Sequence, residues 1–199
     1  DYNLSSTFPV TIPDGQSFVD VILTPVDDAI PEVAETLRLN LGNGNYTIAP
    51  ASSNATVTIA ANDSIAYAIA LTNPTTGSLT EGNSGTQPVT FTVTRSGGTG
   101  VASTVDYAIA GTATNGADYN NINAAGATTA TGTIAFAATE TTKTIALDVL
   151  GETVVEPDET IIVTLSNPNL TAAPESSTVT TNTATATISN DDIASNPSI

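Results

Sequence analysis

The sequence of 199 residues contains no cysteine, no histidine and no tryptophan, and only three lysine or arginine residues. Without cysteine it forms neither a disulfide framework nor a thiolate metal site. Without histidine it lacks a frequent zinc ligand and the most frequent general base near neutral pH. The formal net charge is −17, so the basic surface that nucleic-acid binding needs is missing as well, and we expect no nucleic-acid partner.

Long apolar runs are also absent. No stretch of about 18 apolar residues occurs, so we expect no direct membrane insertion. Thr, Ala, Asn, Ser and Gly are abundant and Lys is scarce, a composition typical of secreted bacterial surface proteins. The sequence therefore predicts a secreted or cell-surface protein. It starts without Met and without a signal-peptide pattern, so we expect a processed product or a piece of a longer chain.

The acidic residues gather in two similar loops, residues 27–36 and residues 151–160. Each loop follows one alternating apolar run and precedes another, so each should connect two strands. Carboxylates crowded in a loop repel one another, and the chain offers only Arg38, Arg95 and Lys143 to oppose them. A hard divalent cation with oxygen ligands, calcium first, is the expected solution.

Alternation of apolar and polar residues predicts strands throughout, and no segment has helical spacing. In the first part of the chain the predicted strands are Phe8–Ile12, Val19–Leu23, Leu37–Leu41 and Ala55–Ile59. Further along they are Ile65–Leu71, Val89–Val93, Val105–Ile109, Ile134–Phe136, Ile145–Val149, Ile161–Leu165 and Ala184–Ile188. Short strands of this number, separated by turn signals, predict an all-β protein built as an immunoglobulin-like antiparallel β-sandwich of about seven strands.

The chain repeats itself. Asp1-Tyr2 matches Asp118-Tyr119, the two acidic loops match each other, and Asp63 matches Asp192. Residues 64–192 therefore form one complete copy, and residues 1–63 form the C-terminal half of another. Residues 193–199 are a linker or the start of a next repeat.

Four motifs follow one another in the complete copy, namely Thr112-Ala113 with Gly116–Tyr119, then Gly132–Phe136, Glu156–Thr160 and Ala186–Asp192. In this order they resemble the Calx-beta repeat, a family that includes the calcium-sensing domains of sodium–calcium exchangers and large bacterial surface proteins. The resemblance implies calcium binding at one end of the sandwich. The ligands that it implies in the complete copy are Glu81, Asp118, Glu152, Glu156, Glu159, Asp191 and Asp192. In the first copy they are Asp1, Asp27, Asp28, Glu32, Glu35 and Asp63.

The sequence departs from the family pattern in both copies. The best calcium-binding members have an acid where Gly151 stands and a third acid where Asn190 stands. The resemblance therefore implies that the calcium site of the complete copy has fewer carboxylate ligands than the best sites of the family, and that it holds one ion where relatives hold several. The first copy carries Asn62 and has no counterpart of Glu81.

The chemistry of calcium gives the same expectation without the family. Calcium takes about 6–8 oxygen ligands, more than one loop supplies, so loop and strand-end carboxylates would have to converge at one tip. The alternative is that Asp118-Tyr119 and Asp191-Asp192 are ordinary turn and strand-end residues with local hydrogen bonds.

Three functions compete. The first is a calcium-stiffened structural or adhesive module of a repeat protein. The second is a carbohydrate- or protein-binding adhesin domain. The third is a glycoside hydrolase or its accessory module, for which Glu156 and Asp118 would be the carboxylate pair. We expect the first and no enzymatic activity, because no aromatic platform for a sugar is visible.

Residues 1–63 should not stand alone, because they hold only about four strands of a sandwich that needs about seven. Exposed strand edges invite pairing with another chain. We expect copies of this chain or adjacent repeats to supply the missing strands by β-strand addition, and favour an extracellular filament or surface layer over a fragment of a long tether.

Overall fold

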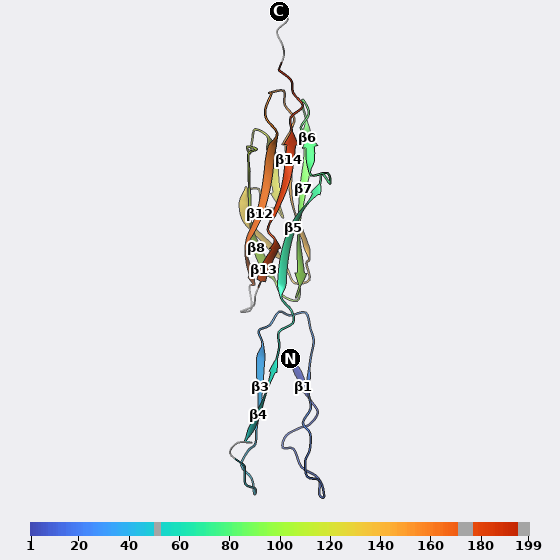
Figure 1. The fold of residues 1–199 in the computed structure, drawn as a ribbon, viewed down its shortest axis with the longest axis vertical. Coiled ribbons are helices and arrows are strands. Elements are labelled where there is room, and N and C mark those ends of the chain that lie inside the picture. Colours follow the sequence, from blue (N-terminus) through green and yellow to red (C-terminus); the bar gives the residue numbers. More distant parts are fainter. Residues whose placement is uncertain (50–52, 171–176, 195–199) are drawn as a thin grey trace, which may run out of the picture. The chain divides into compact units, whose positions relative to one another are not determined.

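The computed structural model describes residues 1–49, 53–170 and 177–194. Its regular elements are strands, and none of the described residues forms a helix long and apolar enough to cross a membrane. The chain divides into two compact units (Figure 1). Unit 1 comprises Asp1–Ala29 and Val33–Ala61, and unit 2 comprises Ile30–Glu32 and Asn62–Ile199.

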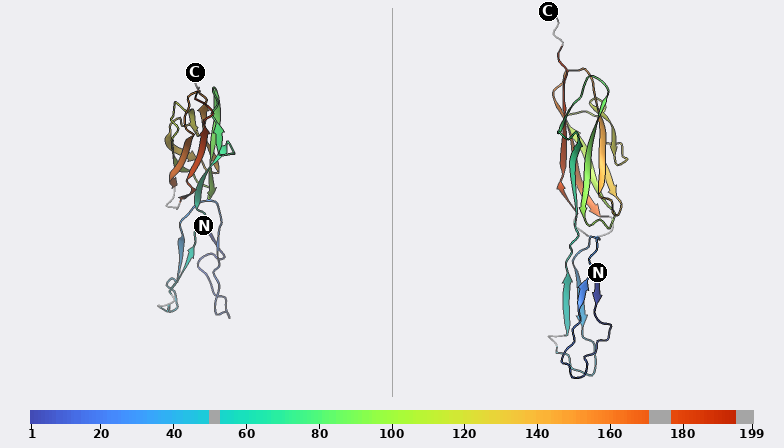
Figure 2. Two further views of the ribbon diagram at one scale, coloured as in Figure 1. Left: turned by 45° about the horizontal axis from the view of Figure 1, so that its top comes forward. Right: turned by 90° about the vertical axis from the view of Figure 1, so that its right-hand side faces the viewer.

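Unit 2 is a sandwich of two five-stranded sheets, whose strands run lengthwise (Figure 2). The first sheet has the order β13-β5-β7-β11-β9 and the second has the order β10-β8-β12-β14-β6. The strands are β5 (Ile65–Asn73), β6 (Ser78–Thr80), β7 (Thr86–Gly97), β8 (Ser103–Gly111), β9 (Tyr119–Ala124), β10 (Thr131–Phe136), β11 (Thr142–Leu150), β12 (Glu159–Leu170), β13 (Ser177–Thr181) and β14 (Thr183–Ser189).

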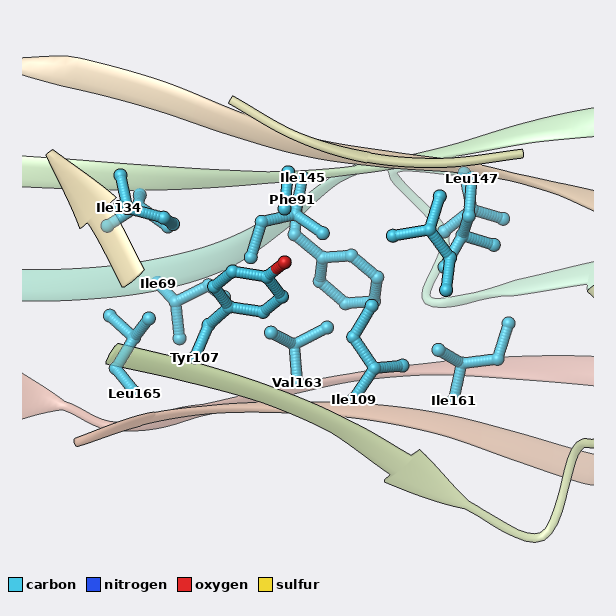
Figure 3. Packing of buried hydrophobic residues seen from close by; sticks show 14 of the residues in the cluster. Ile69, Phe91, Tyr107, Ile109, Ile134, Ile145, Leu147, Ile161, Val163 and Leu165 are labelled. Carbon is cyan, nitrogen blue, oxygen red and sulfur yellow. The ribbon is translucent and has the colours of Figure 1, made fainter. Parts of the chain in front are cut away.

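Alternation along each central strand builds the core. Successive side chains of a strand point to opposite faces, so every second residue of β7, β8, β11 and β12 is buried. Figure 3 shows Phe91, Ile145 and Leu147 of the first sheet facing residues of the second sheet, including Ile109 and Val163. Each such side chain contributes about 1.5–3 kcal/mol by leaving water.

The predicted all-β sandwich is confirmed, with two differences. The structure adds three short strands that alternation did not predict, β6, β9 and β13, and all three lie at sheet edges. An edge strand has one partner instead of two, and the polar sequences of these strands give little alternation. The sandwich is not wholly antiparallel either, because β13 pairs with β5, and β14 with β6, in parallel.

Unit 1 contains two separate two-stranded sheets. One pairs β1 (Tyr2–Leu4) with β2 (Leu23–Pro25), and the other pairs β3 (Glu35–Asn40) with β4 (Asn54–Ile59). The predicted strand Phe8–Ile12 is wrong, and of Val19–Leu23 only Leu23 lies in a strand. By the internal repeat, Phe8–Ile12 matches β10, whose partner in unit 2 is β8. The described residues of unit 1 include no counterpart of β8, so among them this segment has no strand to pair with.

Arg95, in β7, is a buried cation whose two terminal nitrogens donate to oxygen atoms other than carboxylates, while its Nε has no hydrogen-bond partner. Its guanidinium donates hydrogen bonds to the carbonyl oxygens of Val101, Thr99 and Ala137 and to Ser103 Oγ, at 2.8–3.2 Å. It also lies 5.5 Å from the ring centre of Phe136, a favourable cation–π distance. This charge is therefore used to join the backbone of three segments.

Substitution of Phe91 by Ala tests the assignment of the core. Phe91 is 0% exposed, so Phe91→Ala should lower the free energy of unfolding of unit 2 by about 3–5 kcal/mol. Phe18→Ala is the matched control: Phe18 is 67% exposed in unit 1, and its loss should cost less than about 0.5 kcal/mol. Urea unfolding followed by the amide NMR signals of unit 2 measures both. Equal effects would contradict the core assignment.

Candidate metal centre

Two strand ends bring the first group of acids together. Strands β6 and β14 pair in parallel with Thr80 opposite Ser189, so both strands end at the same place. The next residues are Glu81 after β6 and Asp191-Asp192 shortly after β14, and the Glu81 amide donates to the Ser189 carbonyl at 3.2 Å. As a result, one carboxylate oxygen from each of these three acids lies within 4.8 Å of the others.

A second group forms from Asp118, Glu156 and Glu159, again with one oxygen each within 4.8 Å of the others. Glu159 is the first residue of β12, and Asp118 immediately precedes β9. The Leu150 amide donates to the Asp118 carbonyl at 2.9 Å, which ties the start of β9 to the end of β11. The loop between β11 and β12 then carries Glu156 to the same position.

Electrostatic interactions connect the two groups. Glu152 belongs to neither group, but its charge contributes to the raised pKa of Glu81, Glu156 and Asp192. The charge of Glu81 likewise helps to raise the pKa of Glu159 in the other group. Seven carboxylates therefore share one end of unit 2, which we call the acidic end: Glu81, Asp118, Glu152, Glu156, Glu159, Asp191 and Asp192.

Several carboxyl groups of the acidic end ionise less readily than isolated ones, because their pKa values are raised. Burial raises the pKa of Glu81, and the neighbouring carboxylates raise it further. Burial, a hydrogen bond with Asp118 and the charge of Asp118 raise the pKa of Glu159 to about 7. The two basic side chains of unit 2 do not relieve this repulsion, because Lys143 pairs with Glu140 at 2.9 Å and Arg95 is bound to carbonyl oxygens.

Buried carboxylate oxygens without hydrogen-bond partners indicate the kind of ligand that the acidic end can bind. Glu81 Oε1, Glu152 Oε1 and Asp192 Oδ2 are buried and have no hydrogen-bond partner. A buried acceptor without a donor costs about 1–3 kcal/mol, and more when it is charged. Carboxylate oxygens are the preferred ligands of calcium. The residues present therefore fit a hard divalent cation.

A comparison with protein families matches the Calx-beta domain over residues 73–192. The chain belongs to the Calx-beta family. Unit 2 contains the matched region, and the acidic end is where the carboxylates of this Calx-beta sandwich converge. Calx-beta domains bind calcium and are typically non-catalytic.

Among solved structures, the chain is similar to an apo-form Calx CBD1 domain, with 24% identity over 64% of this chain and 98% of that one, and a TM-score of 0.44. It is also similar to CBD12 from CALX1.2, with 21% identity, 64% and 46% coverage and a TM-score of 0.46. A third similar structure is the calcium binding domain CBD12 of CALX1.1, with 25% identity, 62% and 44% coverage and a TM-score of 0.40. No curated protein matches the chain.

The two copies predicted from the internal repeat differ in how many of the expected ligands they gather. In the complete copy, six of the seven expected acids form the two oxygen groups, and the charge of Glu152 contributes to the raised pKa of three of them. Those expected for the first copy divide between the units, and no three of them converge within the described residues. Asp1, Asp27, Asp28 and Glu35 lie in unit 1, and Glu32 and Asp63 lie in unit 2.

The two departures of the complete copy from the Calx-beta pattern, Gly151 and Asn190, have structural roles. A Cβ atom on Gly151 would lie 2.4 Å from the Gly82 carbonyl oxygen and 2.8 Å from the Ser84 nitrogen, so an acid does not fit there without moving the backbone. Asn190 accepts a hydrogen bond from the Glu156 amide at 3.3 Å and donates one to the Asp192 carbonyl at 3.0 Å. Asn190 therefore positions the ligand loop.

Sequence reasoning missed the residues that orient the acids. The Gly82 amide donates to Asp191 Oδ1 at 3.1 Å, and Asn83 Nδ2 donates to Asp192 Oδ1 at 2.8 Å. The Asn190 amide donates to Asp158 Oδ1 at 3.1 Å. The first two contacts join residues 109 positions apart, so no local pattern could reveal them.

The raised pKa of Glu159 predicts an unusual pH dependence. A carboxyl whose pKa rises on folding stabilises the fold below its unfolded pKa, and this contribution is lost as the pH approaches the folded value of about 7. In chelator, the melting temperature should therefore fall as the pH rises from about 5 to about 8. Glu159→Gln should flatten the fall, whereas Asp158→Asn should not. Differential scanning calorimetry measures it, and equal slopes in both variants would contradict the assignment.

Proposed function

We propose that this chain is a calcium-binding structural module of a secreted or cell-surface repeat protein. The observation that carries the proposal is the acidic end of unit 2, where buried carboxylate oxygens lack partners and no basic side chain of the unit is available. A bound divalent cation supplies the positive charge that the fold omits. The expected ligands are the acids of the two groups, with Glu152 between them.

The position of the ligands explains how binding would stiffen the module. Glu81, Asp191 and Asp192 follow strands of the second sheet, whereas Asp118 precedes β9 of the first. A cation held by both groups would join the two sheets at one end. Asp192 also lies directly before residues 193–194, where the chain leaves the sandwich. Fixing this end would restrict the direction in which the next part of an array continues.

The repeat organisation supports a role in assembly. By the internal repeat we take unit 1 to correspond to half of a Calx-beta repeat, and its apolar residues Phe8, Ile12 and Val57 are 56%, 52% and 47% exposed. We therefore propose that the array is extended by strand complementation, as part of an extracellular filament or surface layer. A carbohydrate- or protein-binding adhesin domain is the alternative function.

Hydrolysis of glycosides is not proposed. Its candidate pair, Asp118 and Glu156, shares its oxygen cluster with Glu159. Three acids converging on one point resemble a cation ligand set, whereas glycosidases place two carboxyl groups on either side of a bond.

Calcium should stabilise unit 2 measurably. An ion that binds only the folded state adds about 2.7 kcal/mol at a free concentration 100 times its Kd. We expect a calcium-specific heat in calorimetric titration of chelated protein, and a melting temperature that falls when chelator is added. Sodium at equal ionic strength is the control. The proposal fails if calcium gives no more heat than sodium and chelator leaves melting unchanged.

Two adjacent acids provide a matched comparison. Glu159 belongs to an oxygen cluster, whereas Asp158 is exposed and accepts a hydrogen bond from the Asn190 amide that an asparagine oxygen could also accept. Glu159→Gln should weaken calcium binding at least about 10-fold, and Asp158→Asn by less than about 3-fold. Titration calorimetry distinguishes them, and a larger loss for Asp158→Asn would reverse the assignment.

A further inference from the structure

Unit 1 reproduces the strand pairing of the second half of unit 2: β3 and β4 pair in the register of β12 and β14 throughout, and β1 and β2 follow β9 and β11 up to the register shift at Leu147. Tyr2 lies opposite Pro25 in unit 1, and the matching residues Tyr119 and Val149 lie opposite each other in unit 2. On the other sheet, Glu35 lies opposite Ile59, as Glu159 lies opposite Ile188. Strands β1, β2, β3 and β4 therefore correspond to β9, β11, β12 and β14.

Backbone hydrogen bonds outside the strand ladders match as well. The Val26 amide donates to the Asp1 carbonyl at 2.8 Å, as Leu150 donates to Asp118 at 2.9 Å. In the same way, the Leu41 amide donates to the Ser53 carbonyl at 2.9 Å, and the Leu165 amide donates to the Asn182 carbonyl at 2.7 Å.

A turn is conserved between the copies too. The Gln16 amide donates to the Pro13 carbonyl at 3.0 Å, as the Glu140 amide donates to the Ala137 carbonyl at 3.2 Å. Gly15 and its match Thr139 both have positive φ, 81° and 70°. Unit 1 thus has the backbone of half a sandwich.

The missing half can be named from unit 2. There, β11 lies between β9 and β7, and β12 lies between β14 and β8. In unit 1, β2 pairs with β1, the counterpart of β9, and β3 pairs with β4, the counterpart of β14. Each of these two strands is therefore paired on one side only. The two places beside them correspond to β7 and β8, the centres of the two sheets in unit 2.

The side chains that those strands would cover are exposed in unit 1. Leu165 is 2% exposed in unit 2, whereas its match Leu41 is 54% exposed. Phe136 is 1% exposed, and its match Ile12 is 52% exposed. Between the two small sheets runs an apolar groove of about 250 Å³, whose lining includes Val21, Leu23, Leu37 and Leu39.

We propose that this groove is the docking site for the N-terminal half of another Calx-beta repeat, a segment of the β5–β8 type that lacks its own C-terminal half. Its central strands would pair with β2 and β3 in the places of β7 and β8. The register in unit 2 then sets the contacts: Val21 would lie opposite a residue like Phe91, and Leu39 opposite a residue like Ile109. This inference rests on the proposed role of the chain as a module of a repeat array.

A second copy of this chain is a poorer donor. Its own β7 and β8 are the central strands of a closed sandwich, and Phe91, Val93 and Val105 on them are 0% exposed. Donating them would uncover β11 and β12 in the donor, which exposes as much apolar surface as the docking covers. A donor without those partner strands has no such cost.

The test is a full-length variant in which a copy of residues 64–117 is placed directly before Asp1. The match of Asp118 to Asp1 makes this the natural junction. We expect the amides of residues 19–23 and 37–41 to exchange with solvent at least about 100-fold more slowly than in the original chain. The control carries Phe91→Asp and Tyr107→Asp in the added copy alone and should leave exchange in unit 1 fast. Unit 2, unchanged in all three chains, provides the internal reference for folding.

Exchange is measured in chelator, so the result does not depend on calcium. Equal exchange in the fusion and its control would overturn the proposed donor while leaving calcium binding by unit 2 untouched. Protection of unit 1 in the original chain that grows with protein concentration would also overturn it, because the occupant would then be a second copy. Slow exchange in the fusion together with absent calcium binding would reject the proposed function and retain the docking site.

Discussion

Electrostatic repulsion at the acidic end is the constraint on which the rest of unit 2 depends. Seven carboxylates share this end, and both basic side chains of the unit are engaged elsewhere. Folding without a counter-ion therefore raises the pKa of several acids, Glu159 to about 7. The fold tolerates this because a large apolar core supports it, and a cation would convert the same crowding into a bond between the two sheets.

The sandwich fixes the acids by making strands end together. The parallel pairing of β6 with β14 places Glu81 beside Asp191 and Asp192, although they are far apart in sequence. The tie between Leu150 and Asp118 does the same for the second group. Gly151 permits the close approach of the two loops that a larger residue would prevent. The pairing of the strands thus determines which carboxylates meet at the acidic end.

Alternation in the sequence was sufficient to predict the central strands, because residues such as Phe91 and Val163 face the core between two neighbours. It was insufficient for the edge strands β6, β9 and β13, whose residues are mostly polar, and for Phe8–Ile12, where the pattern is present and the partner strand is not. The acids of the complete copy could be named from motifs. Their division into two groups, and the roles of Asn83 and Asn190, depend on contacts between distant segments that sequence alone does not reveal.

The central claim is that the carboxylates of the acidic end act as one ligand set. The most direct measurement follows the side-chain carboxyl carbon signals by NMR as calcium is added to labelled protein. The account predicts that the cluster signals move together and saturate at the same calcium concentration, while exposed Asp14 and Asp20 of unit 1 stay in place. These cluster signals are those of Glu81, Asp118, Glu156, Glu159, Asp191 and Asp192. Cluster signals that shift no more than those of Asp14 and Asp20 would contradict it.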